Sequence, residues 1–364
     1  MLLCALTVAL AGYAPTPLSG VVTRARQPLP VRMAASLPAG EKCSFVLLAG
    51  GSGSRMKADR PKQFLDLLGK PVLQWDLELL LSMEGIDRVV LVIAESYRDM
   101  PFLKPFAGDE RLIFDAGTGI RELGNLMVKD NPDGAHASLF FSHTHWDHIQ
   151  GFPFFGPAYH PGFSLHIYGN AESRANVKDL LHGQMQQAYF PVPFEALQGE
   201  IDFLAMDQGH RIGDAVISTM AGIHPGGVTI YRVDYGGYSA VFCTDVELDL
   251  MLLSGGVDKP NQGRSFPPEL LRFMQGVNVW VVDCQYTDAL YRQRRNWGHP
   301  SVSTVIALAA QSQVGRVFLT HHDPDHDDDT ITSKVDDAAL HLSMLSPQGL
   351  VHGAREGMVI AVDQ

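Results

Sequence analysis

The chain has 364 residues, of which 46% are hydrophobic and 19% charged, with a formal net charge of -12 and a pI near 5.6. This length and apolar content suit one large or two smaller globular domains, and the acidic balance argues against a general nucleic-acid surface, which needs a basic stripe. The 4 cysteines are scattered without C-x-x-C spacing, which indicates neither a disulfide framework nor a thiolate zinc site.

Residues 1–40 contain no Asp, Glu or Lys; the apolar run MLLCALTVALAG precedes a stretch with three arginines. This pattern predicts a targeting presequence. It resembles the two-part plastid (chloroplast) presequences of algae with secondary plastids, and an ordinary secretory signal is the alternative. The apolar run is too short to span a membrane and no later segment is long enough, so we expect no membrane partner.

The stretch SFVLLAGG, residues 44–51, is typical of a buried parallel strand that enters a glycine-rich loop. Backbone N–H groups and cations in this loop can converge on a triphosphate. The expected binding residues are Gly50, Gly51, Gly53, Arg55 and Lys62. A helix over 71–83 and a strand over 87–94 would complete a βαβ unit. The alternative is that the loop is merely a turn.

A strand over 111–114, the turn DAGTG and a helix over 120–128 lead to a second apolar run, SLFF, and then to HTHWDH. In an extended chain His143 and His145 lie on the same face, so two imidazoles converge. Asp147 and His148 follow where the chain can turn into a helix, so they can reach a second point nearby. The spacing predicts a dinuclear metal site, and a polar loop is the alternative.

Later strands are expected at 165–169, 215–222, 228–235, 239–245, 279–285 and 316–321, with helices near 176–189, 268–275 and 301–311. Four stretches end with residues of metal-ligand type, which are His224, Asp245, His299 and the pair His321 and His322. The acidic run DPDHDDD at 323–329 is by default a solvated loop.

The residues at these strand ends can complete two sets of metal ligands. His224 can complete a three-histidine site with His143 and His145, while Asp147, His148 and His321 would form the other site. Asp245 is the natural bridging carboxylate. Histidine-rich ligation without thiolates favours two zinc ions, with manganese or iron as substitutes.

With DAGTGIRELG, FSHTHWDHIQGFPFF, IHPGG, CTDVE, WGH and AREGM, the chain resembles metallo-β-lactamase-fold hydrolases of the ribonuclease Z and phosphodiesterase-like branch over about 111–362. The resemblance implies an αββα sandwich with two metals at the sheet edges. It implies the seven ligands named above, with His321 favoured over His322. It also implies that Asp115 holds an imidazole from outside the ligand shell.

The same resemblance implies phosphodiester hydrolysis by a metal-bridging hydroxide, with His299 as proton donor and Asp147 as a catalytic residue as well as a ligand. A small phosphodiester or nucleotide would be the substrate, and a homodimer is possible. A β-lactam or thioester would use the same hydroxide on a carbonyl. A metal-binding protein without turnover is a further alternative.

Residues 44–100 resemble a different family, the 2-C-methyl-D-erythritol 4-phosphate cytidylyltransferases, through LLAGGSGSRM, RPKQFLDLLGKPVLQWDL and ESYRDM. The resemblance implies that the glycine loop holds CTP and that Arg55 and Lys62 stabilise the pentavalent phosphorus. The later motifs of that family are missing. A nucleotidyltransferase acting in isoprenoid biosynthesis is therefore the alternative function.

Two incomplete families meet near residue 105, because the first strands of the metallo-β-lactamase sandwich are also missing. We therefore expect a presequence over 1–40, a truncated cytidylyltransferase-like βαβ segment of a Rossmann-like fold over 41–104, and the hydrolase domain over 105–364. A gene fusion with loss on both sides, or a gene model that joins two exons, would explain this arrangement.

Overall fold

The computed structural model describes residues 6–9, 43–48, 65–67, 69–81, 86–92, 111–169, 176–206, 208–259 and 261–360. The chain forms two compact units, one of Met1–Leu10 with Glu110–Gln364 and one of Ala11–Asp109. The proposed CTP loop with Gly50, Gly51, Gly53, Arg55 and Lys62 lies outside the described residues.

The unit over Ala11–Asp109 contains a parallel pair of strands, β2 (Cys43–Leu48) and β5 (Ile86–Val92). Helix α1 (Val72–Leu81) lies between them in the chain, after the short antiparallel strands β3 (Asp66–Leu67) and β4 (Lys70–Pro71). Leu73 and Leu77 of α1 are buried one turn apart. The predicted βαβ unit is confirmed.

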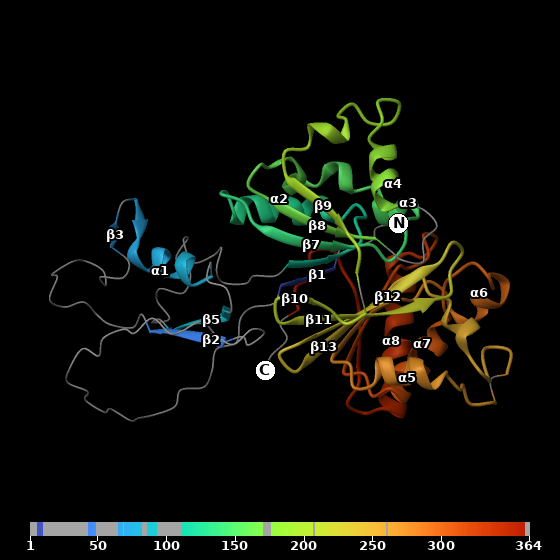
Figure 1. Cartoon of the computed structure of the whole chain (residues 1–364). Coiled ribbons are helices and arrows are strands. Elements are labelled where there is room, and N and C mark those ends of the chain that lie inside the picture. The colour runs from blue at the N-terminus through green and yellow to red at the C-terminus, as the bar shows by residue number, and fades with distance from the viewer. Residues whose placement is uncertain are drawn as a thin grey trace, which may run out of the picture. The chain divides into compact units, whose positions relative to one another are not determined.

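The other unit contains two sheets packed face to face (Figure 1). The first has the order β1-β6-β7-β8-β9, with β6 to β9 parallel and β1 antiparallel at the edge. Its strands are β1 (Leu6–Ala9), β6 (Arg111–Phe114), β7 (His136–Phe140), β8 (Ser164–Tyr168) and β9 (Glu200–Leu204). Strand β1 lies within the predicted presequence, and it pairs with β6 where earlier strands of the sandwich were expected to be missing.

The second sheet has the order β10-β11-β12-β13-β14-β15-β16, antiparallel up to β13 and parallel from β13 onward. Its strands are β10 (His210–Ile212), β11 (Ala215–Gly222), β12 (Val228–Tyr235), β13 (Tyr238–Cys243), β14 (Val279–Asp283), β15 (Arg316–Thr320) and β16 (Leu350–Gly353). β9, β10 and β16 were not predicted from the sequence.

The two sheets enclose an aromatic core. The ring centroid of Phe114 lies 5.3 Å from that of Phe140 in the same sheet, and 5.4 Å from those of Tyr231 and Phe242 in the other sheet. Rings of this size bury large apolar areas and prefer such offset or tilted contacts. This core fixes the spacing between the two sheets, and therefore between the loops that leave them.

Helices cover both outer faces, so the predicted αββα sandwich is confirmed (Figure 1). One face carries α2 (Ile120–Asp130), α3 (Trp146–Ile149), η5 (Phe152–Phe154), η6 (Gly156–Tyr159), α4 (Val177–Gln184) and η7 (Phe194–Ala196). The remaining helices follow in the second half of the chain, and they are η8 (Leu248–Met251), α5 (Pro268–Met274), α6 (Asp288–Gln293), α7 (Val302–Gln311) and α8 (Asp328–Leu345). None of the helices in the described ranges is long and apolar enough to cross a membrane.

The acidic run at 323–329 is a largely exposed loop over 323–327, as expected, but it differs from the expectation at Asp323 and at its end, where α8 begins. Asp323 is buried and is paired with Arg294, and Asp327 caps α8 by accepting a hydrogen bond from the N–H of Thr330. Asp328 and Asp329 occupy the first turn of α8, where the helix dipole favours negative charge. The run therefore marks a helix start.

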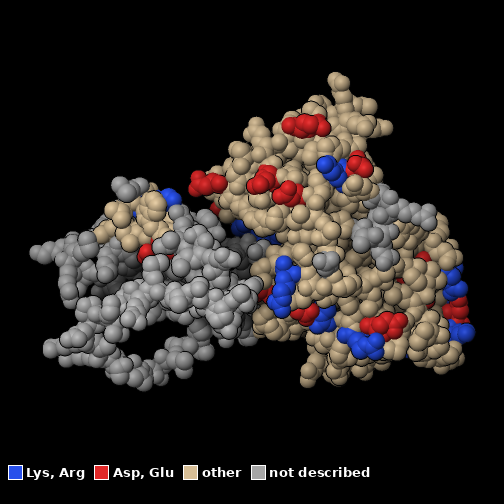
Figure 2. Space-filling view, in the orientation of Figure 1, with Lys and Arg blue, Asp and Glu red and all other residues tan. Residues whose placement is uncertain are grey.

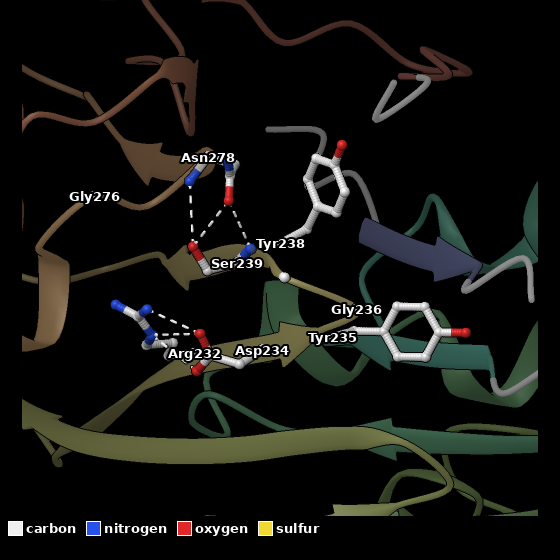
Figure 3. Close-up of a pocket in the computed structure, with 9 residues that line it drawn as sticks. Arg232, Asp234, Tyr235, Gly236, Tyr238, Ser239, Gly276 and Asn278 are labelled. Atoms are coloured by element: carbon white, nitrogen blue, oxygen red, sulfur yellow. Dashed lines mark hydrogen bonds and ion pairs between the residues drawn. The ribbon is translucent and has the colours of Figure 1, made fainter. Parts of the chain in front are cut away.

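A hollow of about 420 Å³ lies at the turn between β12 and β13 (Figure 3). Its polar groups are already paired, because Arg232 donates to Asp234 and Asn278 accepts from Ser239. The predicted metal ligands follow the opposite end of β13, so this hollow is separated from them by the length of the strand.

Candidate metal centre

One edge of the sandwich collects the predicted ligands, because the strands that precede them all run in the same direction. β6 and β7 are parallel, and so are β13, β14 and β15. β11 is antiparallel to β12, which is antiparallel to β13, so the carboxyl end of β11 lies at the same edge. Loops that leave the carboxyl ends of such strands meet at one place.

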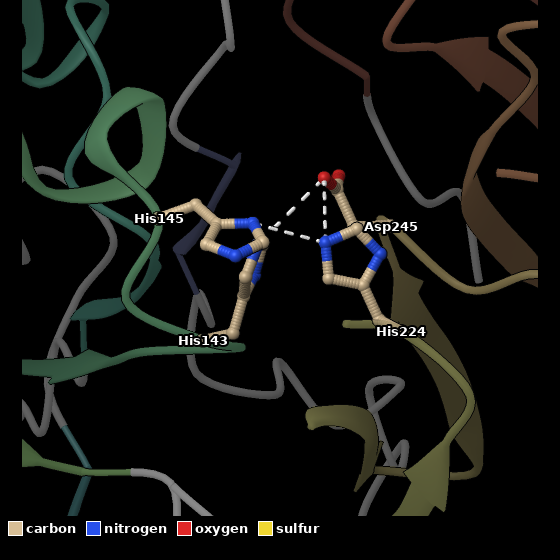
Figure 4. A group of neighbouring side chains, drawn as sticks. All are labelled: His143, His145, His224 and Asp245. Carbon is tan, nitrogen blue, oxygen red and sulfur yellow. Dashed lines mark hydrogen bonds and ion pairs between the residues drawn. The ribbon is translucent and has the colours of Figure 1, made fainter. Parts of the chain in front are cut away.

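The first group consists of His143, His145, His224 and Asp245, whose ligand atoms all lie within 4.8 Å of one another (Figure 4). Nδ1 of His145 lies 3.0 Å from Nε2 of His143 and 3.0 Å from Nε2 of His224. Three imidazoles from two different sheets therefore converge on one point.

The second group consists of Asp147, His148, Asp245 and His321, again with ligand atoms within 4.8 Å. Asp147 and His148 lie on the single turn of α3, and His321 directly follows β15. His322, which the sequence offered as the alternative to His321 at the same strand end, belongs to neither group.

Asp245 belongs to both groups through different oxygens. Its Oδ2 lies 3.7 Å from Nε2 of His143 and 3.7 Å from Nε2 of His224. Its Oδ1 lies 3.4 Å from Nε2 of His148 and 3.3 Å from Nε2 of His321. The carboxylate thus lies between two sets of imidazole nitrogens.

The donor atoms fit two divalent ions. Ligands of one tetrahedral zinc ion, with bonds of about 2.0 Å, lie roughly 3.3 Å apart, which is close to the separations within each group. Nε2 of His148, Nε2 of His321 and Oδ2 of Asp147 are buried without a hydrogen-bond partner. Buried polar atoms rarely stay unpaired in proteins, so these three atoms call for a shared cation.

Buried charge gives a second argument for a cation. Burial lowers the pKa of His321, but the neighbouring charge of Asp245 outweighs it, and the pKa rises to about 9. The same balance raises the pKa of His148. The carboxylates therefore hold protons on these imidazoles, and a metal ion would take the place of those protons.

Asp115 orients one histidine of each group. Its Oδ2 lies 2.8 Å from Nδ1 of His148 and accepts a hydrogen bond from the hydroxyl of Ser142 at 2.7 Å. The oxygen of the same hydroxyl lies 3.1 Å from Nδ1 of His143 and can accept a hydrogen bond from its N–H. Both rings then direct Nε2 toward the donor groups. Ser142 had no predicted role.

Asp283 holds His299. Its Oδ2 lies 2.6 Å from Nδ1 of His299, and its Oδ1 lies 4.0 Å from Nδ1 of His321. Burial lowers the pKa of His299, but the charge of Asp283 and this hydrogen bond outweigh it, so the pKa lies above its usual value. Asp283 and His299 form a third group with Asp245 and His321. Asp283 was missed, although it lies within the predicted strand VWVVDCQ and ends β14.

Glu247 anchors the loop that carries His299. This buried carboxylate accepts hydrogen bonds from the Tyr291 hydroxyl at 2.8 Å, from the N–H of Asn296 at 2.7 Å and from the N–H of Gly298 at 2.8 Å. The motif CTDVE contains Glu247, but no role was predicted for it.

Only glycine fits at position 298, because an added Cβ would lie 2.1 Å from Nδ1 of His224 and φ is +95°. This close approach lets the Gly298 carbonyl accept a hydrogen bond from Nδ1 of His224 at 3.0 Å. Nε2 of His224 then faces His143 and His145. The anchored loop therefore orients a histidine of the first group as well as His299.

Three residues of the centre have left-handed backbone, with φ values of 60° at Asp115, 54° at Asp245 and 51° at His321. Each comes within two residues of a strand end. Such conformations cost free energy in residues other than glycine, and they persist where the surroundings hold them. The N–H of Asp115, for example, donates to the carbonyl of Phe140 at 2.8 Å.

Comparison with known families finds two matches in the chain. The model of the "Beta-lactamase superfamily domain" matches residues 110–322, which contain all of the residues grouped above. The model of "2-C-methyl-D-erythritol 4-phosphate cytidylyltransferase" matches residues 43–121. The two matches overlap over residues 110–121.

The curated relatives are cytidylyltransferases. The enzyme of Haemophilus influenzae (strain PittEE) is 38% identical over 74 residues, which is 20% of this chain and 32% of that protein. The enzyme of Mannheimia succiniciproducens is 53% identical over 51 residues, which is 14% of this chain and 22% of that protein. The chain thus spans about a third or less of the length of these relatives.

Among solved structures, the chain is similar to the metallo-beta-lactamase fold protein YhfI from Bacillus subtilis, with 18% identity, a TM-score of 0.46, and coverage of 69% of this chain and 87% of that chain. It is similar to the short form of human tRNase Z, with 13% identity, a TM-score of 0.46, and coverage of 70% and 89%.

We predict that Glu247→Gln destabilises the sandwich by about 1–3 kcal/mol. The N–H₂ group of the glutamine cannot accept a hydrogen bond, so it would leave at least one of the three donors that Glu247 binds without a partner. Tyr291→Phe, which removes one hydrogen bond and leaves the two backbone donors paired, should cost less. Urea unfolding followed by tryptophan fluorescence measures both. Equal stability of Glu247→Gln and the wild type would contradict the anchoring role.

Proposed function

The chain belongs to the beta-lactamase superfamily, and on this premise we propose that it is a dinuclear metal-dependent hydrolase of small phosphodiesters. The observation that carries the proposal is the position of Asp245, whose two oxygens face two different sets of imidazoles. A carboxylate in this position can bridge two adjacent ions.

In this proposal one ion is held by His143, His145 and His224, and the other by Asp147, His148 and His321. The two sets share Asp245. The histidine-rich, thiolate-free donors favour zinc, with manganese or iron as substitutes. When bound, such a pair of ions lowers the pKa of water and neutralises charge on a phosphoryl group.

His299 has the geometry of a general acid. Because Asp283 accepts a hydrogen bond at Nδ1, an imidazolium at this position keeps its second proton on Nε2, where a leaving oxygen can receive it. Its ring lies 5.5 Å from that of His224 and 4.9 Å from that of His321, which places His299 beside both groups. Asp283 is the positioning residue of this acid.

Asp147 is the second proposed catalytic residue. Its side chain is 20% exposed, whereas that of His148, beside it on α3, is fully buried. Because Oδ2 is buried, Oδ1 is the oxygen that would accept a hydrogen bond from a water molecule approaching the centre from solvent, and orient it for attack. The Asp147 carboxylate would therefore serve both as a metal ligand and as the group that orients the water molecule.

A phosphodiester fits this centre better than a β-lactam or a thioester. Displacement at phosphorus benefits from charge stabilisation on both the attacking and the leaving oxygen, which two adjacent ions can supply. A departing alkoxide is strongly basic and needs a proton donor, and His299 is in a position to be one. Hydrolysis of bis(p-nitrophenyl) phosphate distinguishes this function from metal binding without turnover.

We predict that protein prepared in zinc-replete buffer holds close to two ions per chain. His145→Ala should reduce the content to about one while the sandwich stays folded, because His145 contributes Nδ1 to the first set alone. His341→Ala, on the exposed side of α8, is the matched control and should retain two ions. Elemental analysis gives the count, and one ion or none in the folded wild type would refute the dinuclear arrangement.

His299→Ala should retain both ions and slow diesters with alkyl leaving groups by about 100-fold or more, the usual contribution of general acid catalysis. Aryl esters such as p-nitrophenyl diesters should be slowed far less, because their leaving groups need little help from a proton. Asp283→Asn should show the same leaving-group dependence with a smaller loss. Steady-state rates across both ester types measure this, and equal slowing of both would count against the acid.

Cytidylyl transfer is a second candidate function, favoured by the match over residues 43–121. Catalysis of phosphoryl transfer depends on positioning and electrostatic stabilisation of both reactants, and a single βαβ unit supplies only the phosphate loop. We therefore predict no cytidylylated erythritol product from the chain, with at most weak CTP binding that depends on Arg55 and Lys62. Product formation that is abolished by Lys62→Ala would establish this second function.

A further inference from the structure

Three large apolar side chains are exposed beside the first histidine group. Trp146 is 60% exposed, Trp297 is 60% exposed and Ile223 is 41% exposed. Each precedes or follows a residue of the centre directly in the chain. Trp146 follows His145, Ile223 precedes His224, and Trp297 precedes Gly298.

These neighbours place the three side chains at the border of the centre. Consecutive Cα atoms are about 3.8 Å apart, so each apolar side chain starts within one residue of the centre. The rings of His145 and His224 lie 4.8 Å apart, and the carbonyl of Gly298 contacts His224. Trp146, the first residue of α3, and Trp297, in the loop that carries Gly298, are therefore each one residue away from a group that forms or contacts the histidine cluster.

Arg294 restrains Trp297. Its guanidinium lies 5.5 Å from the centroid of the Trp297 ring and 5.5 Å from that of Tyr286, and it also pairs with the buried Asp323. The cation covers part of the indole, and more than half of the side chain still faces solvent. A tryptophan that is both restrained and exposed is suited to stack on a flat ring.

Charge at the centre gives little help to a polyanionic substrate. Within the described residues, Asp147, Asp245 and Asp283 form ion pairs with histidines, and Arg294 is neutralised by Asp323. On the face shown in Figure 2, acidic side chains of the described residues predominate in the upper part of the sandwich unit, and acidic and basic side chains lie side by side in its lower part. The exposed apolar side chains beside the centre are therefore the groups that we consider for recognition beyond the phosphoryl group.

Resting on the proposed function, we propose that Trp146 and Trp297 bind the aromatic base of a nucleotide diester and so determine its specificity. The phosphate would lie at the metal centre and the base would stack on indole. Base–aromatic stacking contributes enough free energy to change affinity by roughly tenfold or more per ring. Ile223 would extend the same apolar surface.

Two substrates with one leaving group isolate the base. These are the p-nitrophenyl ester of thymidine 5′-monophosphate and its counterpart with 1,2-dideoxyribose, which has the same sugar phosphate without the base. The zinc-loaded wild type should have a KM roughly tenfold lower for the thymidine ester. Trp146→Ala and Trp297→Ala should remove most of that difference with little change in kcat, and Trp297→Phe should restore part of it.

Met344→Ala is the control, because Met344 is 67% exposed at the far end of α8, about 24 Å along the helix from Asp328. It should leave both KM values unchanged. Equal KM values for the two diesters in the wild type, or equal effects of the tryptophan variants on both, would overturn the assignment while leaving the hydrolase intact. No turnover of either diester by protein that holds two ions would instead refute the proposed function.

Discussion

The centre depends on holding imidazole nitrogens close to each other around one buried carboxylate. The imidazole nitrogens around Asp245 lie about 3 Å apart, and they cannot fully satisfy one another's capacity for hydrogen bonds. Burial also removes the water molecules that could supply the missing hydrogen bonds. The scaffold maintains this arrangement with three further buried carboxylates. Asp115 orients His143 through Ser142 and His148 directly, Asp283 holds His299, and Glu247 anchors the loop beside His224.

These carboxylates lie at different strand ends, which makes the centre a property of the whole sandwich. Asp115 follows β6, Glu247 follows β13 and Asp283 ends β14. The core around Phe114 fixes the distance between the two sheets, so it also fixes the distance between His145 and His224. A change in core packing would therefore alter the spacing of donors that belong to different sheets.

Local spacing made part of this centre predictable from the sequence. The positions of His143, His145, Asp147 and His148 follow from one strand end and one helical turn. His224, Asp245 and His321 could be grouped because each follows an apolar run. Asp283 also follows an apolar run. Its partner is His299, which the loop from Asn296 to His299 brings back to the end of β14, and no local sequence pattern encodes this contact. Helix α8 was missed because its start was interpreted as a charged loop.

The two family matches differ in how much of a binding site the described residues within them form. Residues 110–322 contain both donor groups and their supporting carboxylates. In the described part of the other unit, β2 pairs with β5 alone, and a parallel sheet needs more strands than two to enclose a substrate. Among the described residues, the donor groups and the exposed indoles that we propose to bind a nucleotide all lie in the sandwich.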